Sequence, residues 1–95
     1  MFLVDISYIQ PMEAVEAATA AHRAFLDIHI GSGLLILTGP KVPRTGGILI
    51  ARGGETREEL AAILAEDPFQ ALGIAEYTIT EFAAVKYSPA LADLI

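Results

Sequence analysis

Two histidines, His22 and His29, are the only imidazoles of this 95-residue chain, and both lie in one Ala-rich segment. On a helix, seven residues place them on one face about two turns, or roughly 10 Å, apart. Because helical metal sites use spacings of three or four, a metal site made of these histidines alone is disfavoured. A metal held by His22 and carboxylates from other segments stays open. We expect His29 to be structural.

His22 could act as a general acid or base, because an imidazole both accepts and donates a proton near neutral pH. Such a group needs a carboxylate to orient it, and the best candidate is Asp67, in the run Asp67-Pro68-Phe69. Both residues also have a purely structural interpretation. His22 could be an ordinary helix histidine, and an Asp before a Pro is typical of a turn or a helix end.

Other chemistries find little support. The chain has no cysteine, which excludes thiolate nucleophiles and disulfides, and no serine stands in a Gly-x-Ser-x-Gly pattern. Gly31-Ser32-Gly33 lies at the end of a predicted helix and not at its start, so it indicates a helix end and not a phosphate cradle. Three basic residues flank a predicted hairpin and could attract an anionic substrate, although a solvated loop is the favoured interpretation: Lys41, Arg44 and Arg52.

The charge and hydropathy of the chain limit its partners. Its net charge is −6 and its six basic residues are scattered, which argues against nucleic-acid binding. No run approaches the ~18 apolar residues of a membrane span, and the first residues do not resemble a secretion leader, so we expect a cytoplasmic protein without membrane contact. Apolar residues make up 54% of the chain, and a subunit interface is the expected place for the excess.

Hydrophobic periodicity and turn signals divide the chain into six elements and a tail. In the first strand Phe2, Val4 and Ile6 should share one face, and in the first helix the expected apolar stripe follows Ala14, Ala18, Ala21, Phe25, Ile28 and Ser32. The second strand should close at a Gly39-Pro40 turn, and Thr56 should cap the second helix. The ranges are strand 2–9, helix 12–32, strand 34–38, strand 48–52, helix 56–65, strand 75–85 and tail 87–95.

This βαββαβ order predicts a single α+β domain over residues 1–95, with a ferredoxin-like fold. The expected architecture is a four-stranded antiparallel sheet with two helices on one face. The second and third strands are apolar on both faces, so the sheet needs a second cover. Two copies packed sheet to sheet would supply it, which predicts a homodimer.

Several short motifs, in this order, resemble the YciI-like (YCII-related) family. They are His22 in the first helix, Gly33-Leu34-Leu35 leading to Thr38-Gly39-Pro40, Gly47 before the third strand, Asp67-Pro68-Phe69, Gly73 and the strand containing Tyr77. The resemblance implies a dimeric barrel with a cleft beside the sheet and a His–Asp pair, here His22 and Asp67. Many relatives place an Arg-Pro pair where this chain has Thr19 and Ala20, so an arginine of that kind is missing.

The family includes a dehydrochlorinase, and muconolactone isomerase-like proteins share its barrel. The resemblance therefore implies a cofactor-free and metal-free enzyme that transfers a proton or eliminates a group on a small cyclic or aromatic compound. His22 and Asp67 would be catalytic, and Gly39, Pro40 and Phe69 would line the substrate cleft. The alternative is a non-catalytic dimeric module that binds a small ligand or serves as an accessory subunit. Loss of turnover on His22→Ala, with the fold intact, would separate the two.

Overall fold

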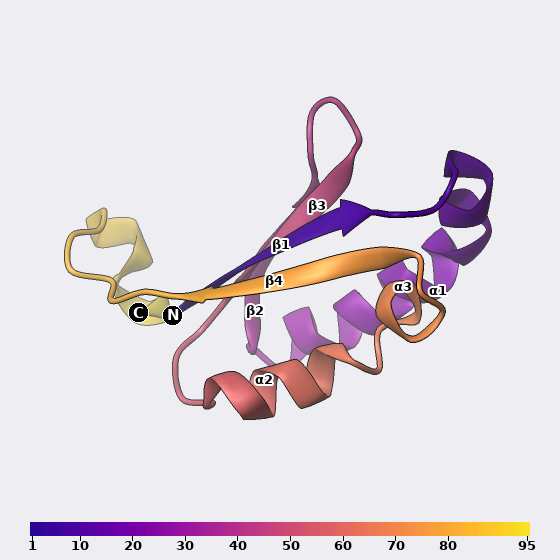
Figure 1. Ribbon diagram of the computed structural model, residues 1–95. Coiled ribbons are helices and arrows are strands. Elements are labelled where there is room, and N and C mark those ends of the chain that lie inside the picture. Colours follow the sequence, from indigo (N-terminus) through magenta and orange to yellow (C-terminus); the bar gives the residue numbers. More distant parts are fainter.

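The computed structural model describes all 95 residues and resolves four strands, three α-helices and a 3₁₀ turn (Figure 1). Along the chain these elements are β1 (Phe2–Tyr8), α1 (Met12–Gly31), β2 (Leu35–Pro40), β3 (Gly46–Ala51), α2 (Arg57–Leu64), α3 (Pro68–Ala71), β4 (Ala75–Glu81) and η1 (Pro89–Leu94).

The four strands form one antiparallel sheet in the order β2-β3-β1-β4. The three α-helices cover one face of this sheet and leave the other open (Figure 1). The predicted ferredoxin-like α+β fold is confirmed. The prediction of two helices was incomplete, because the segment after Asp67 forms the additional one-turn helix α3.

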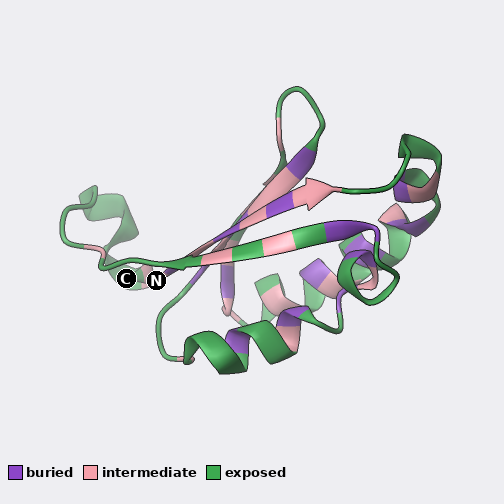
Figure 2. Ribbon diagram, viewed as in Figure 1, coloured by how far each residue is buried: buried purple, intermediate pink, exposed green.

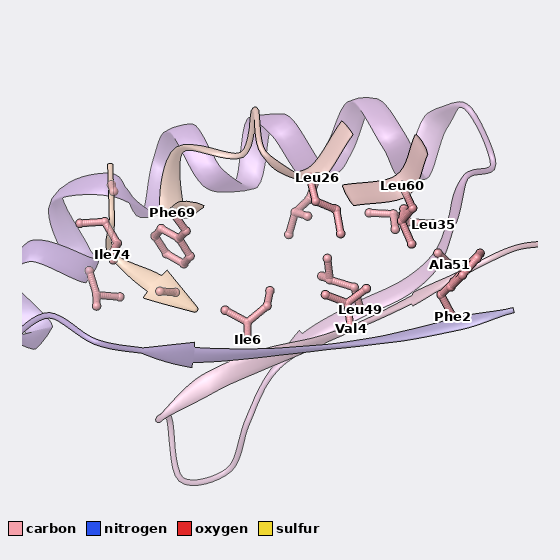
Figure 3. Close-up of a cluster of buried hydrophobic side chains, with 14 residues drawn as sticks. Phe2, Val4, Ile6, Leu26, Leu35, Leu49, Ala51, Leu60, Phe69 and Ile74 are labelled. Atoms are coloured by element: carbon pink, nitrogen blue, oxygen red, sulfur yellow. The ribbon is translucent and has the colours of Figure 1, made fainter. Parts of the chain in front are cut away.

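The hydrophobic core lies between the helices and the covered face of the sheet (Figure 3). In β1, Phe2, Val4 and Ile6 are buried and alternate with partly exposed residues, as the period of two predicts (Figure 2). The fourteen buried hydrophobic residues are Phe2, Val4, Ile6, Val15, Ala18, Leu26, Leu35, Leu49, Ala51, Leu60, Leu64, Phe69, Ile74 and Ala75.

The predicted apolar stripe of α1 was wrong in its rotation. The buried residues of this helix are Val15, Ala18, His22 and Leu26, whereas Ile28 is 67% exposed. Apolar residues occur all around α1, so periodicity alone leaves more than one stripe open. The structure selects the face that buries two branched aliphatic side chains and turns His22 inward.

Three predicted boundaries also shift. Gly39 and Pro40 are the last residues of β2, not a turn, β3 begins two residues early at Gly46, and β4 ends at Glu81. The start of α2 is as predicted: the Thr56 hydroxyl accepts a hydrogen bond from the Glu59 amide at 3.1 Å, and the Glu59 carboxylate accepts one from the Thr56 amide at 3.0 Å. The hydrogen bond from the Thr56 amide lowers the pKa of Glu59.

The tail forms η1 beside the end of the sheet where the N-terminus lies (Figure 1). Its residues are mainly exposed, and the Arg52 guanidinium donates a hydrogen bond to the Asp93 carbonyl at 3.1 Å. None of the helices combines the length and apolar character that crossing a membrane requires.

Candidate functional site

Asp67 is a fully buried carboxylate at the start of α3, with no exposed surface. Its backbone is extended, Pro68 follows at the first helical position, and its Oδ1 accepts a hydrogen bond from the Phe69 amide at 3.0 Å. Asp67 is thus the N-cap of α3, as Asp-Pro in a turn suggests. This local role fixes the direction in which the carboxylate points.

The carboxylate of Asp67 meets His22, which lies 45 residues earlier in the chain. The His22 Nδ1 atom lies 2.8 Å from Oδ1 and 2.9 Å from Oδ2 of Asp67. The Tyr77 hydroxyl of β4 donates a further hydrogen bond to Oδ2. Three partners from α1, α3 and β4 therefore satisfy a charge whose burial would otherwise be costly.

Burial raises the pKa of Tyr77, and the adjacent Asp67 carboxylate raises it further. The phenol therefore stays protonated and acts as a hydrogen-bond donor to Asp67. A carboxylate only accepts hydrogen bonds, so the Nδ1 atom of His22 carries the proton in this contact. In the neutral ring the Nε2 atom is then the one with a free lone pair.

The imidazole plane is held by an aromatic stack. The ring of His22 lies parallel to that of Phe69, with centroids 3.9 Å apart and planes 8° apart, and Tyr8 meets Phe69 edge-on at 5.8 Å. The Nε2 atom of His22 makes no hydrogen bond within the protein, yet no buried side-chain nitrogen or oxygen lacks a partner. Nε2 is therefore accessible to molecules outside the protein.

His22 opens onto a cleft of about 370 Å³ between α1, β1 and the β2–β3 hairpin. Gly39, Pro40 and Phe69 line this cleft, so the structure brings together all five residues that the sequence suggested. Part of the wall is apolar and part is polar, and the further lining residues include Ile6, Tyr8, Thr19, Arg23, Leu26, Thr38, Arg44, Gly46, Gly47 and Leu49.

Of the other candidate groups, Arg44 lines the cleft, whereas His29, Lys41 and Arg52 lie outside it. His29 contacts Phe25 on α1, with ring centroids 4.6 Å apart. The Lys41 ammonium lies 2.8 Å from Asp5 and, by hydrogen bonding to it, lowers the pKa of that carboxyl. The structure brings no three His, Asp or Glu side chains together in the arrangement of a metal site.

Sequence reasoning did not find the contact of Tyr77 with Asp67 or the place of Tyr8 in the cleft. Strand pairing explains both. Tyr77 stands opposite Ile6 in the β1–β4 pair, and Tyr8 continues the covered face of β1. The register of the β1–β4 pair brings the two tyrosine side chains to the same end of the sheet.

Comparison with known proteins agrees with this architecture. The chain superposes on the 5-chloro-2-hydroxyhydroquinone dehydrochlorinase of Burkholderia phenoliruptrix, solved in complex with 2,5-dihydroxybenzoquinone, with a TM-score of 0.71. The superposition covers 87% of this chain and 94% of the other at 20% sequence identity, which shows a common fold. No curated protein matches the chain. The YCII-related domain matches residues 1–83, and the chain therefore belongs to the YCII-related domain family.

Proposed function

We propose that this protein is a cofactor-free enzyme in which His22 and Asp67 perform general acid–base chemistry on a small cyclic or aromatic compound. The observation that carries the proposal is the accessible Nε2 atom of an imidazole whose Nδ1 atom is bound 2.8 Å from a fully buried carboxylate. That arrangement holds one tautomer and stabilises the imidazolium formed when Nε2 takes a proton.

The proposed step is a proton transfer from the substrate to Nε2 of His22. In an elimination, the electrons of the broken bond to hydrogen form a new double bond while a leaving group such as chloride departs. In an isomerisation, the imidazolium returns the proton to another atom of the same substrate. Neither reaction changes the oxidation state of the protein or needs a second reactant, and Asp67 stays ionised throughout.

Two features favour a cyclic or aromatic substrate. The wall of the cleft is partly apolar, with Ile6, Leu26 and Phe69 among its lining residues, and a Cβ atom on Gly39 would meet nothing within 4 Å. The structurally similar protein of Burkholderia phenoliruptrix is a dehydrochlorinase of a chlorinated hydroquinone. We therefore place chlorinated hydroquinones first among candidate substrates and cyclic lactones second.

The decisive experiment measures chloride release and substrate loss for the wild-type protein, His22→Gln and Asp67→Asn. We expect both variants to lose turnover by roughly 10²- to 10⁴-fold, the usual contribution of a positioned acid or base. Asp67→Asn should fail because an amide NH₂ donates to Nδ1 and so forces the proton onto Nε2. Long-range ¹H–¹⁵N spectra of the neutral imidazole would show that exchange of tautomer directly.

The matched control is His29→Gln, which makes the same substitution on the same helix outside the cleft and should change turnover by less than about twofold. Circular dichroism would establish that each variant is folded. Full activity in folded His22→Gln would contradict the proposal. Ligand binding without turnover in the wild-type protein would favour the alternative, a binding or accessory module.

We further propose that the protein is a homodimer that pairs the open faces of its two sheets. Leu3, Leu37 and Ile50 are neighbours in register on this face, and Leu37 is 56% exposed. An exposed apolar patch of this kind is typical of an interaction surface.

A further inference from the structure

We propose that Arg44 is an anion-recognition residue, so that the cleft selects a substrate bearing an ionised oxygen, such as a carboxylate, phenolate or enolate. This inference rests on the proposed function for the place of the substrate beside His22. Its own evidence is that two hydrogen bonds position the Arg44 side chain in the cleft, and that no acidic side chain pairs with its charge.

Two neutral groups from different elements position the guanidinium of Arg44. Its Nε atom donates to the Tyr8 hydroxyl at the end of β1, and its Nη2 atom donates to Thr19 Oγ1 on α1, each at 3.3 Å. The guanidinium carbon also lies 6.0 Å from the centre of the Tyr8 ring. The side chain therefore extends from the hairpin loop towards α1, across the cleft that both segments line.

The charge of Arg44 has no partner within the protein. The only ion pairs are His22 with Asp67 and Lys41 with Asp5, although the chain has twelve acidic residues. No aspartate or glutamate lines the cleft. A guanidinium has five N–H donors, and the two bonds to neutral oxygens leave the others free for a ligand. In a protein of net charge −6, such a cation stands out as a site for an anion.

The other basic residues near the hairpin are not equivalent to Arg44. Lys41 pairs with Asp5, and Arg52 binds the Asp93 carbonyl of the tail. Arg23 lines the cleft one residue after His22, but no hydrogen bond from its side chain holds it in place. Of the cations around the cleft, only Arg44 is oriented by the protein before a ligand arrives.

The position of Arg44 also suits the proposed chemistry. A substrate that loses a proton to His22 gains negative charge, which cyclic ketones, phenols and lactones place mainly on oxygen. A fixed guanidinium in the same cleft stabilises that charge as it develops. An ionised oxygen held at Arg44 would at the same time orient the substrate within the cleft.

Binding of benzoate and benzamide tests this inference without any need for turnover, because the two probes have nearly the same size and differ in charge. The titrations would follow the chemical shifts of backbone amides at the cleft in the wild-type protein, in Arg44→Gln and in Arg52→Gln. Arg52→Gln is the control, because it makes the same change of side chain and charge outside the cleft. We expect wild type and Arg52→Gln to favour benzoate by about tenfold or more, and Arg44→Gln to lose that preference while keeping its weak affinity for benzamide.

Equal affinity for both probes in wild-type protein, no binding of either, or an unchanged preference in Arg44→Gln would overturn the inference. Loss of the preference for benzoate in Arg23→Gln instead of in Arg44→Gln would overturn it as well. The titration with His22→Gln separates this question from the proposed reaction, since the preference for benzoate should persist there. Selective anion binding without turnover would leave the inference standing and count against the enzyme. Turnover without a preference for benzoate would support the proposed enzyme and overturn the inference about Arg44.

Discussion

Asp67 serves the fold and the proposed site with the same carboxylate. It caps α3 through the Phe69 amide and holds His22 through Nδ1, while Tyr77 donates the third hydrogen bond. A buried charge with three donors is stable as long as all three remain. Side chains around it should therefore affect stability and proton transfer together, although to different extents.

Tyr77→Phe separates these two effects, because it removes one donor from Asp67 and leaves the contact with His22. We expect a loss of about 1 kcal/mol in the free energy of unfolding at neutral pH, the typical value of a buried hydrogen bond. Urea denaturation measures it. A variant as stable as wild type would show that the phenol contributes nothing to holding the carboxylate.

The raised pKa of Tyr77 also predicts how the free energy of unfolding depends on pH in the alkaline range. Its pKa is raised in the folded protein, above the value near 10 of an unfolded chain, so its contribution is complete below about pH 10. Above that pH the unfolded chain releases the proton first, and the free energy of unfolding should fall by up to about 1.4 kcal/mol per pH unit from this group. Tyr77→Phe should lack this part of the decrease, whereas Tyr87→Phe, in the exposed tail, should retain it.

At the scale of elements, the β2–β3 hairpin forms one wall of the cleft and must approach β1 closely. Gly46, the first residue of β3, stands opposite Ser7, and a Cβ atom on it would lie 1.7 Å from the Ile6 carbonyl oxygen. No side chain fits there without displacing backbone. The lack of a side chain at Gly46 thus permits the close approach of β3 to β1 beside the Arg44 loop, where the Tyr8 amide donates a hydrogen bond to the Thr45 carbonyl at 3.0 Å.

Gly46→Ala should therefore destabilise the protein by more than about 3 kcal/mol or separate the start of β3 from β1. Thermal unfolding and amide spectra of β1 and β3 would report either result. Gly31→Ala is the matched control: Gly31 ends α1 with open space around it, so alanine there should be neutral or stabilise by up to about 1 kcal/mol. Equal effects of the two substitutions would contradict this reading of the hairpin.

At the scale of the whole molecule, one face of the sheet carries no α-helix (Figure 1). All three α-helices lie on the other face, and the tail lies beside one end of the sheet (Figure 1). Near its centre, this face also carries the Lys41–Asp5 pair, so it combines apolar residues with one polar contact. A second copy would bury both.

Leu37→Lys should convert the proposed dimer into a monomer, because it places a charge on the apolar part of this face. Light scattering after size-exclusion chromatography measures the mass. Ile28→Lys adds the same charge at an exposed position of α1, where it should leave the dimer intact. A monomeric wild-type protein, or a dimer that only Ile28→Lys dissociates, would rule out this interface.

The sequence by itself determined the order of the elements, because local signals carry it. The alternation in β1, the capping box at Thr56 and the turn chemistry around Asp67-Pro68 each depend on residues within a few positions of one another. The same short-range patterns singled out His22 and Asp67. They named Asp67 only as a candidate partner of His22, and it was the family resemblance that implied the pair, because nothing local connects positions 45 residues apart.

Tertiary structure alone decided how the helix and the strands meet. The apolar residues of α1 permit more than one buried face, and only packing against the sheet selects the face with Val15, His22 and Leu26. Strand register then brings Tyr77 to Asp67, and the close approach at Gly46 brings Arg44 to Tyr8. These are long-range contacts whose free energy depends on the packed shape of the whole domain, so no local pattern in the sequence encodes them.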